Sequence, residues 1–194
     1  GMLDQLLIGK TSRPFDQILW EYKYRSVFGS SGIIKLNNIG FEKRYLSLHT
    51  FGFNKNNFTL RFHTDLRSKK IAHLQKNFKS FLLFYNQKSK LQIRIKCDSH
   101  LLSDEKSKKD TWDKSQEISR RCYYVPKAPS SVIDKPILND DLDVEDKNLG
   151  YKVFSIIEAK VVELDILELN YSGHVRVKME VQNGDLISSR WIMP

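Results

Sequence analysis

The chain has 194 residues, 40% of them hydrophobic, 11% aromatic and 28% charged, which allows a packed core in a single domain spanning residues 1–194. This composition excludes a chain that is disordered throughout and a collagen-like repeat. The net charge of +9 is unevenly distributed, because residues 1–97 contain 18 Lys or Arg and 5 Asp or Glu, whereas residues 98–194 contain 14 and 18. Three explanations stay open: a phosphorylated cofactor, nucleic acid, or a solvated surface without a partner.

The first elements in chain order are a helix and a hairpin. Apolar residues recur at helical spacing after Pro14 and predict a helix over residues 14–27. Residues 33–36 form a short apolar run, residues 37–40 have turn chemistry, and residues 43–50 alternate. This pattern predicts two strands joined by a tight turn.

The middle of the chain predicts three more strands and a second helix. Residues 58–64 alternate as a strand, and residues 53–57 before them are expected to form a loop. Ser68 is placed to cap a helix over residues 69–77, which would bury Ile71 and Leu74. Residues 80–85 are apolar on both faces and indicate a central strand, and residues 91–97 alternate strictly.

The second half begins with a charged segment at residues 104–124, in which Trp112, Ile118 and Cys122 are spaced for one apolar helix face. This segment is expected to form a surface helix or a pair of helices. A proline-containing and acidic loop is expected over residues 125–150. Strands are predicted over residues 156–168, 174–182 and 186–193, with the last hairpin turn at residues 182–185. Short, tightly connected strands favour a mainly β fold with flanking helices, built as an antiparallel barrel or sandwich.

One segment has the residue types of a phosphate site. Arg44 lies on a predicted strand, and Ser68, Lys69 and Lys70 begin a predicted helix. Backbone amides at a helix N-terminus, the helix dipole and cationic donors together bind phosphate. The histidines show no metal-ligand spacing, so no metal site is expected. The usual hydrolase, zinc-peptidase and dinucleotide-binding motifs are absent from the sequence.

The order of several short motifs resembles the pyridoxamine 5′-phosphate oxidase superfamily of FMN-binding split barrels. The C-terminal residues 161–181 and the closing RWIMP are also similar to the last strands of that family. The motifs are R-x-L-x-L at Arg44–Leu48, F-x-T-[ND] at Phe62–Asp65, L-x-S-[RK]-K at Leu66–Lys70, N-x-x-x-x-L-L-F-Y at Asn77–Tyr85 and Q-x-R at Gln92–Arg94.

The resemblance implies an antiparallel split β-barrel that forms a homodimer, with two FMN molecules in the subunit interface. The resemblance implies that the FMN phosphate is held by Arg44, Ser68, Lys69 and Lys70, and that the ribityl chain and ring are lined by His63 and Thr64. It also implies that main-chain groups of Leu46 and Ser47 face the isoalloxazine edge, that Gln92 hydrogen-bonds the flavin, and that Arg176 reaches it from the other subunit.

Departures from the family pattern concern the substrate. His49 replaces a lysine that reaches the substrate phosphate in the true oxidases, and the substrate-binding R-x-H near the C-terminus is not evident. Arg120 and Arg121 are further candidates for binding an anionic substrate, with surface cations as the alternative. We therefore expect a cytoplasmic FMN flavoprotein, an oxidoreductase of unassigned substrate and catalytic residues, with no membrane partner. The alternatives are a nucleic-acid-binding barrel and a split barrel that binds haem or a deazaflavin.

Overall fold

The structure is a computed structural model that describes residues 31–37, 43–54, 58–86, 90–142 and 144–194. For residues 31–54 and 84–86 it describes the backbone and its pairing. The helix expected over residues 14–27 lies outside the described residues, as do residues 38–40 of the turn expected at residues 37–40.

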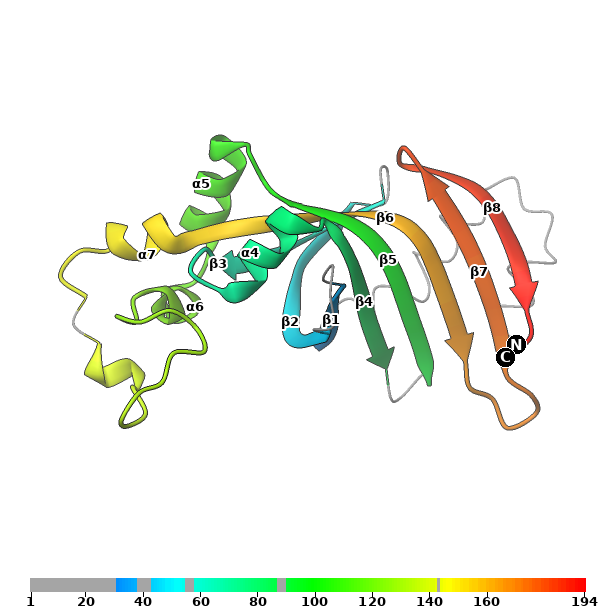
Figure 1. The fold of residues 1–194 in the computed structure, drawn as a ribbon, viewed down its shortest axis with the longest axis horizontal. Helices are drawn as coiled ribbons and strands as arrows, with labels where there is room; N and C mark the ends of the chain where they lie inside the picture. The colour runs from blue at the N-terminus through cyan, green and yellow to red at the C-terminus, as the bar shows by residue number, and fades with distance from the viewer. Residues whose placement is uncertain (1–30, 38–42, 55–57, 87–89, 143) are drawn as a thin grey trace.

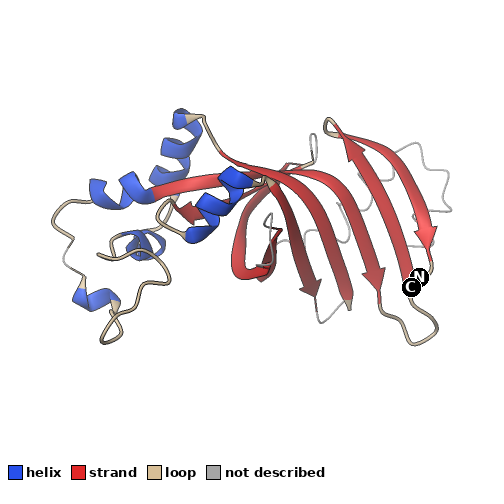
Figure 2. Ribbon diagram, in the orientation of Figure 1, coloured by secondary structure: helices blue, strands red, loops and turns tan. Residues whose placement is uncertain are grey.

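The described residues form one antiparallel sheet flanked by short helices (Figures 1 and 2). None of these helices is both long and apolar enough to span a lipid bilayer. The strands are β1 (Ser31–Asn37), β2 (Lys43–Asn54), β3 (Thr59–Asp65), β4 (Lys79–Asn86), β5 (Leu91–Leu101), β6 (Phe154–Glu168), β7 (Val175–Gln182) and β8 (Asp185–Ile192). The helices are α4 (Lys69–Lys76), α5 (Glu105–Lys114), α6 (Glu117–Arg120) and α7 (Asn148–Val153), with 3₁₀ turns η2 (Arg121–Tyr123) and η3 (Asn139–Asp141).

Strand β6 organises the sheet because it pairs with three other strands. One of its edges pairs with β5 along most of its length. Its other edge pairs with β3 over residues 154–160 and with β7 over residues 163–168. Since β3 also pairs with β2, each strand from β1 to β6 has a hydrogen-bonded neighbour on both sides, and the β7–β8 hairpin extends from β6.

The main core lies on the inner face of these strands. Strand β5 alternates as predicted, with Leu91, Ile93, Ile95 and Cys97 buried. Helix α4 packs Ile71 and Leu74 into the same core, which confirms the predicted apolar face of this helix. Each fully buried aliphatic side chain contributes about 1.5–3 kcal/mol to folding.

A second, aromatic cluster lies on the outer face of the first residues of β6. Trp112 of α5 packs against Phe154 and Ile156, and three tyrosines surround it. The residues from α5 to α7 form this lobe, at the left of Figure 1. We call residues 102–153 the aromatic lobe; its tyrosines are Tyr123, Tyr124 and Tyr151.

The charged segment forms the helices α5 and α6, which confirms the expected pair of helices, but one expectation for the aromatic lobe is wrong. Trp112, Ile118 and Cys122 do not share one helix face, because α5 ends before Ser115, whose backbone is extended and whose hydroxyl donates to the Trp112 carbonyl. Ile118 and Cys122 are therefore exposed. Residues 125–150 are mostly loop, with η3 and the beginning of α7 as the described exceptions.

The other boundaries differ only slightly from expectation. Strand β2 continues to Asn54, so part of the predicted loop at residues 53–57 is strand, with a bulge between Thr50 and Gly52. The last hairpin turns at Asn183 and Gly184, which have φ values of 51° and 81°. Positive φ at both central residues is what a two-residue hairpin turn requires, and asparagine and glycine adopt it most readily.

Candidate functional site

The turn between β3 and α4 is built on an ion pair between Asp65 and Arg67. Arg67 donates from Nε to Oδ1 at 3.0 Å and from Nη2 to Oδ2 at 2.7 Å, and its amide donates to Oδ1 at 2.8 Å. The carboxylate is largely buried and its charge is compensated by this fork. Because the carboxylate is already paired, the turn does not prevent Lys69 and Lys70, which follow it, from binding an anion.

Ser68, Lys69 and Lys70 follow this turn at the N-terminus of α4. Ser68 occupies the N-cap position, but its side chain makes no capping hydrogen bond, so the predicted side-chain cap is wrong. Lys69 is exposed and Lys70 is half-buried. Burial lowers the pKa of Lys70, and the charge of Asp65 opposes this shift. A partly desolvated ammonium at a helix N-terminus gains from a bound anion, so these residues fit a phosphate group.

His63 and Thr64 lie at the end of β3, next to the beginning of β6. The register places His63 opposite Ile156 and Thr64 opposite Ser155. The His63 ring packs edge-on to Phe154, with 5.1 Å between ring centroids. Burial lowers the pKa of His63, so the imidazole is neutral at neutral pH. A neutral imidazole beside aromatic rings fits the edge of an uncharged planar ring.

The four predicted residues of β2 are placed by strand register. Arg44 pairs with Leu36, at the end of β1 that also pairs with Ser80 of β4. Toward the start of β1 the same register pairs Leu46 with Ile34, Ser47 with Ile33 and His49 with Ser31, without a bulge. The four predicted residues of β2 therefore lie along nearly the whole length of β1.

Gln92 and Arg176 lie at the other end of β6, each opposite Leu167. Arg176 donates two hydrogen bonds to Asp165, from Nε at 2.9 Å and from Nη2 at 2.6 Å. Burial of Asp165 opposes its ionisation, but the hydrogen bonds from Arg176 and nearby cationic charges outweigh burial and lower its pKa. The sequence reasoning missed Asp165, although a carboxylate inside the apolar run of residues 164–167 was a signal that it would need a cationic partner.

The predicted site residues are not all gathered in one place. His63 lies opposite Ile156 and Arg176 opposite Leu167, 11 residues apart along β6. This separation is about 36 Å of strand, at about 3.3 Å per residue. Figure 1 shows α4 and β3 toward one end of the sheet and β7 toward the other. In a single chain Arg176 therefore does not adjoin the N-terminus of α4.

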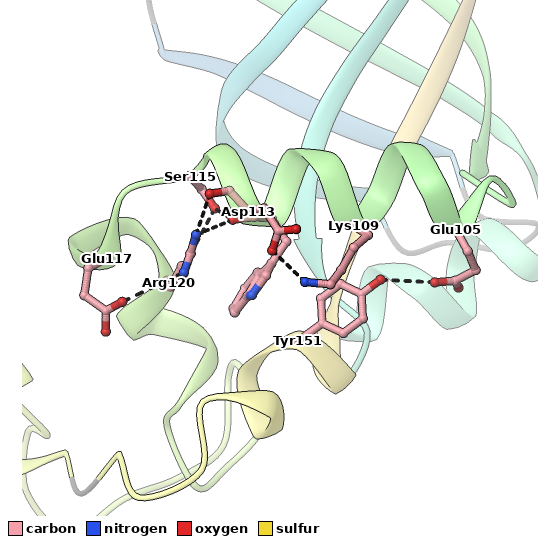
Figure 3. Close-up of polar contacts among 8 residues, drawn as sticks. Glu105, Lys109, Asp113, Ser115, Glu117, Arg120 and Tyr151 are labelled. Carbon is pink, nitrogen blue, oxygen red and sulfur yellow. Dashed lines mark hydrogen bonds and ion pairs between the residues drawn. The ribbon is translucent and has the colours of Figure 1, made fainter.

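Arg120 is engaged within the aromatic lobe (Figure 3). Its Nη2 donates to the carbonyl oxygens of Trp112 at 2.7 Å and Asp113 at 2.9 Å, and its guanidinium lies 5.2 Å from the Trp112 ring centroid. Both carbonyls belong to the last turn of α5, and the Trp112 carbonyl also accepts from the amide and the hydroxyl of Ser115, so Arg120 and Ser115 together close that helix terminus. Arg121 donates from Nη1 to the carbonyl of Asn139 at 3.1 Å.

Contacts between α5 and α7 hold the aromatic lobe together. The Tyr151 hydroxyl of α7 donates to Glu105 of α5 at 3.2 Å, and Lys109 of α5 lies 5.6 Å from the centroid of the Tyr151 ring (Figure 3). Gly150 packs so closely on the aromatic rings that an added Cβ would lie 2.5 Å from a Tyr124 ring carbon. This position of α7 therefore requires glycine.

Both ends of the segment from Val125 to Val153 are fastened to the turn before α4. The Leu66 amide donates to the Val153 carbonyl at 2.7 Å. Arg67 donates from Nη1 to the Val125 carbonyl at 2.8 Å. The sequence reasoning missed this connection, because it joins residues far apart in the chain. The segment between Val125 and Val153 therefore begins and ends beside the turn that precedes Lys69 and Lys70.

A cavity of about 550 Å³ lies elsewhere, where β3 and β7 part along β6. Thr59, Glu158, Lys160 and Asn183 are among the residues that line it. Among the predicted site residues whose side chains the structure describes, none lines this cavity. It is therefore separate from the turn before α4.

Comparison with protein families matches part of the chain to a known family model. Residues 32–103 match the model of the pyridoxamine 5′-phosphate oxidase FMN-binding domain. This range contains all the predicted cofactor-binding residues except Arg176. A search of curated proteins finds no match to the chain.

Solved structures match over nearly the whole chain. A pyridoxamine 5′-phosphate oxidase-related, FMN-binding protein of Nostoc punctiforme is 20% identical with a TM-score of 0.78, covering 95% of this chain and 100% of that one. PhzG of Burkholderia lata, in complex with tetrahydrophenazine-1-carboxylic acid, is 13% identical with a TM-score of 0.70, covering 98% and 96%. A general stress protein 26-related protein of Clostridium acetobutylicum is 13% identical with a TM-score of 0.55, covering 83% and 94%. The chain therefore has the split-barrel fold of these proteins, and its resemblance to the pyridoxamine 5′-phosphate oxidase-related, FMN-binding family is confirmed.

Proposed function

We propose that the protein is a homodimeric FMN-dependent oxidoreductase. The observation that carries this proposal is the N-terminus of α4, where Lys69 and half-buried Lys70 follow a carboxylate already neutralised by Arg67. This arrangement lies inside the segment that matches the FMN-binding domain model. When bound, FMN would supply the redox chemistry, and the protein would supply position and electrostatics.

The cofactor phosphate would bind at the start of α4. Lys69 and Lys70 would contribute charge, and the Ser68 hydroxyl would contribute a donor that no capping bond uses. Arg44 would join them from β2. A phosphate would also relieve the desolvation that lowers the pKa of Lys70.

The ribityl chain and ring would extend from there along the outer face of the sheet. His63 and Thr64 would line them from β3, and main-chain groups of Leu46 and Ser47 would face the isoalloxazine edge. A neutral His63 would offer one donor and one acceptor without adding charge beside the ring. Gln92 lies opposite Leu167, at the same end of β6 as Arg176, so it would hydrogen-bond the flavin beside Arg176 and not beside the α4 terminus of its own chain.

Arg176 would reach this cofactor from a second copy of the chain. Its place at the far end of β6 supports this assignment, because the N-terminus of α4 in the same chain is remote from it. In a two-fold dimer each copy would offer its α4 end to the Arg176 end of the other, so the contact would occur twice. The Asp165 carboxylate would fix the guanidinium orientation before the partner docks.

The substrate remains unassigned. His49 would face it from β2, as the family resemblance implies. Arg120 and Arg121 already donate to backbone carbonyls within the aromatic lobe, and we propose no substrate role for them. The two cysteines, Cys97 and Cys122, are free thiols, which fits the proposed cytoplasmic location.

The test is the visible spectrum of the purified protein, followed by titration with FMN and mass spectrometry of any group released on denaturation. A flavin spectrum and a released mass of FMN would support the proposal. A colourless protein that takes up no FMN would contradict it. Haem or deazaflavin would be identified by the same spectrum, and salt-sensitive binding of single-stranded nucleic acid without a chromophore would favour the nucleic-acid alternative.

A further inference from the structure

Arg67 binds acceptors on two separate parts of the chain. Its Nε and Nη2 donate to the two oxygens of Asp65 at 3.0 Å and 2.7 Å, and its Nη1 donates to the Val125 carbonyl at 2.8 Å. All three guanidinium nitrogens therefore have an acceptor within the protein. Because the guanidinium is planar and rigid, the contact with Val125 also keeps the other two nitrogens on Asp65.

The two lysines that follow Arg67 have no such partner. Neither Lys69 nor Lys70 forms an ion pair with any residue that the structure describes. Lys70 is half-buried, and burial lowers the pKa of its ammonium group. The charge of Arg67 is thus used within the protein, whereas the charge of Lys70 is available to a ligand.

Asp65 is the group that would compete with a ligand for Lys70. Its carboxylate is 9% exposed, and its negative charge opposes the fall in the pKa of Lys70. Among the described residues, Arg67 is the one ion-pair partner of Asp65. Without Arg67, the uncompensated carboxylate would attract the Lys70 ammonium and repel a phosphate at the start of α4.

We propose that Arg67 is a positioning residue of the anion site at the N-terminus of α4. It engages the Asp65 carboxylate and so keeps Lys70 available to the phosphate, while its own guanidinium stays on Asp65 and Val125. This inference rests on the proposed function. It adds the residue that sets how strongly the proposed phosphate site attracts an anion.

Opposite charge changes within the Asp65 and Arg67 pair test this role. Arg67→Ala should raise the dissociation constant for FMN about 10-fold or more, because it leaves the buried charge of Asp65 uncompensated. Asp65→Asn removes that charge and should lower the constant a few-fold. The double variant has neither charge and should bind FMN within about 3-fold of wild type. Flavin fluorescence titration measures all three constants.

Three results would overturn the proposal. Weaker binding by Asp65→Asn would show that the pair shapes the turn and that its charge balance is unimportant. A double variant that binds much more weakly than wild type would make Arg67 a direct ligand of the phosphate. Unchanged binding by Arg67→Ala would remove any role. If Arg67→Ala does not fold, the other two variants still decide, because neither contains an unpaired buried carboxylate.

Arg61→Ala is the matched control, because Arg61 also lies on β3 and also pairs with a carboxylate. Its Nε donates to Glu158 at 2.8 Å, and its side chain is 35% exposed against 25% for Arg67. Arg61 precedes Asp65 by about 13 Å along the strand, at about 3.3 Å per residue. This distance exceeds the Debye length of about 8 Å, so the FMN constant should change less than about 2-fold. An equal loss in Arg61→Ala and Arg67→Ala would overturn the proposal.

A measurement without FMN separates this inference from the proposed function. The rate at which an amine-reactive reagent acylates Lys70, followed by peptide mass spectrometry, reports how readily its ammonium loses a proton. The rate should fall in folded Arg67→Ala, where Asp65 attracts the ammonium, and recover in the double variant. A wild-type chain that takes up no FMN but shows this pattern would contradict the cofactor and support the role of Arg67. FMN uptake with an unchanged acylation rate in Arg67→Ala would overturn the role of Arg67 and leave the cofactor.

Discussion

The two ends of β6 use charge in different ways. At the Phe154 end, Lys69 and Lys70 begin a helix, and the nearby carboxylate is already engaged by Arg67. At the Glu168 end, Arg176 is held in a bidentate pair with Asp165. At the Phe154 end, Lys69 and Lys70 can therefore bind an anionic ligand, whereas at the Glu168 end Arg176 is fixed in position by Asp165. This difference is what a site shared between two copies would need.

The aromatic lobe belongs only to the first end, and removing its centre should have the largest effect. Trp112→Ala should lower the free energy of unfolding by about 3–5 kcal/mol, because the ring is buried among Phe154 and the surrounding tyrosines. Denaturant unfolding measures the loss. Trp191→Ala, at the partly exposed tryptophan of β8, should cost much less and serves as the control. Similar losses for the two variants would show that the lobe is not a packed unit.

The next largest effect concerns the lysines at the N-terminus of α4, at the Phe154 end of β6. Lys70→Ala should weaken FMN binding by roughly 30-fold, since a hydrogen bond to a charged group contributes about 1.5–3 kcal/mol. Lys109→Ala removes a lysine that pairs with Asp113 on α5 and should leave FMN affinity unchanged. Fluorescence titration with FMN compares them. An equal loss in both variants would mean that general positive charge, not the α4 terminus, attracts the cofactor.

A smaller effect is expected at the second end. Asp165→Asn should lower the free energy of unfolding by about 1–2 kcal/mol, because this ion pair is partly buried. The folded-state pKa of Asp165 lies below its ordinary value of 3.8, so the pair contributes stability above about pH 4 and loses it as the pH falls through the folded value. Unfolding midpoints between pH 2 and 7 should therefore converge for wild type and variant at the acid end. A constant difference would contradict the assignment.

The smallest effect is a pH dependence of cofactor binding. Lys70 loses its proton at a lower pH than an ordinary lysine, so FMN affinity should fall a few-fold as the pH rises into the alkaline range. Lys70→Arg keeps its charge and should show a flatter profile over the same range. Titrations at several alkaline pH values measure both slopes. Parallel profiles would indicate that another group governs the decline.

The sequence predicted most of the described fold because its strands alternate and its turns have distinctive chemistry. Residues 91–97 and the Asn183-Gly184 turn are examples in which local pattern was sufficient. The sequence did not reveal where α5 ends, because Ile118 has the spacing of an apolar helix face although the chain has already turned at Ser115. Tertiary contacts decide such ends, and periodicity does not contain them.

The candidate site was predicted where its residues are adjacent in sequence, as in Ser68, Lys69 and Lys70. Pairs formed across the fold were missed. Asp165 and Arg176 are joined by strand register, and Arg67 reaches Val125 through the docking of the lobe. A resemblance of motifs assigns roles to single positions, but it does not say which neighbours hold them.

The dual pairing of β6 has a consequence for how the chain assembles. Strand β3 ends at Asp65 and β5 at Leu101, but β6, which pairs with both, begins only at Phe154. During synthesis each of these strands keeps an open edge while the whole intervening lobe is made, and open edges attract other chains. Contacts between such distant residues also form slowly. Completion of the sheet therefore awaits one late segment, and chains truncated before residue 154 should aggregate.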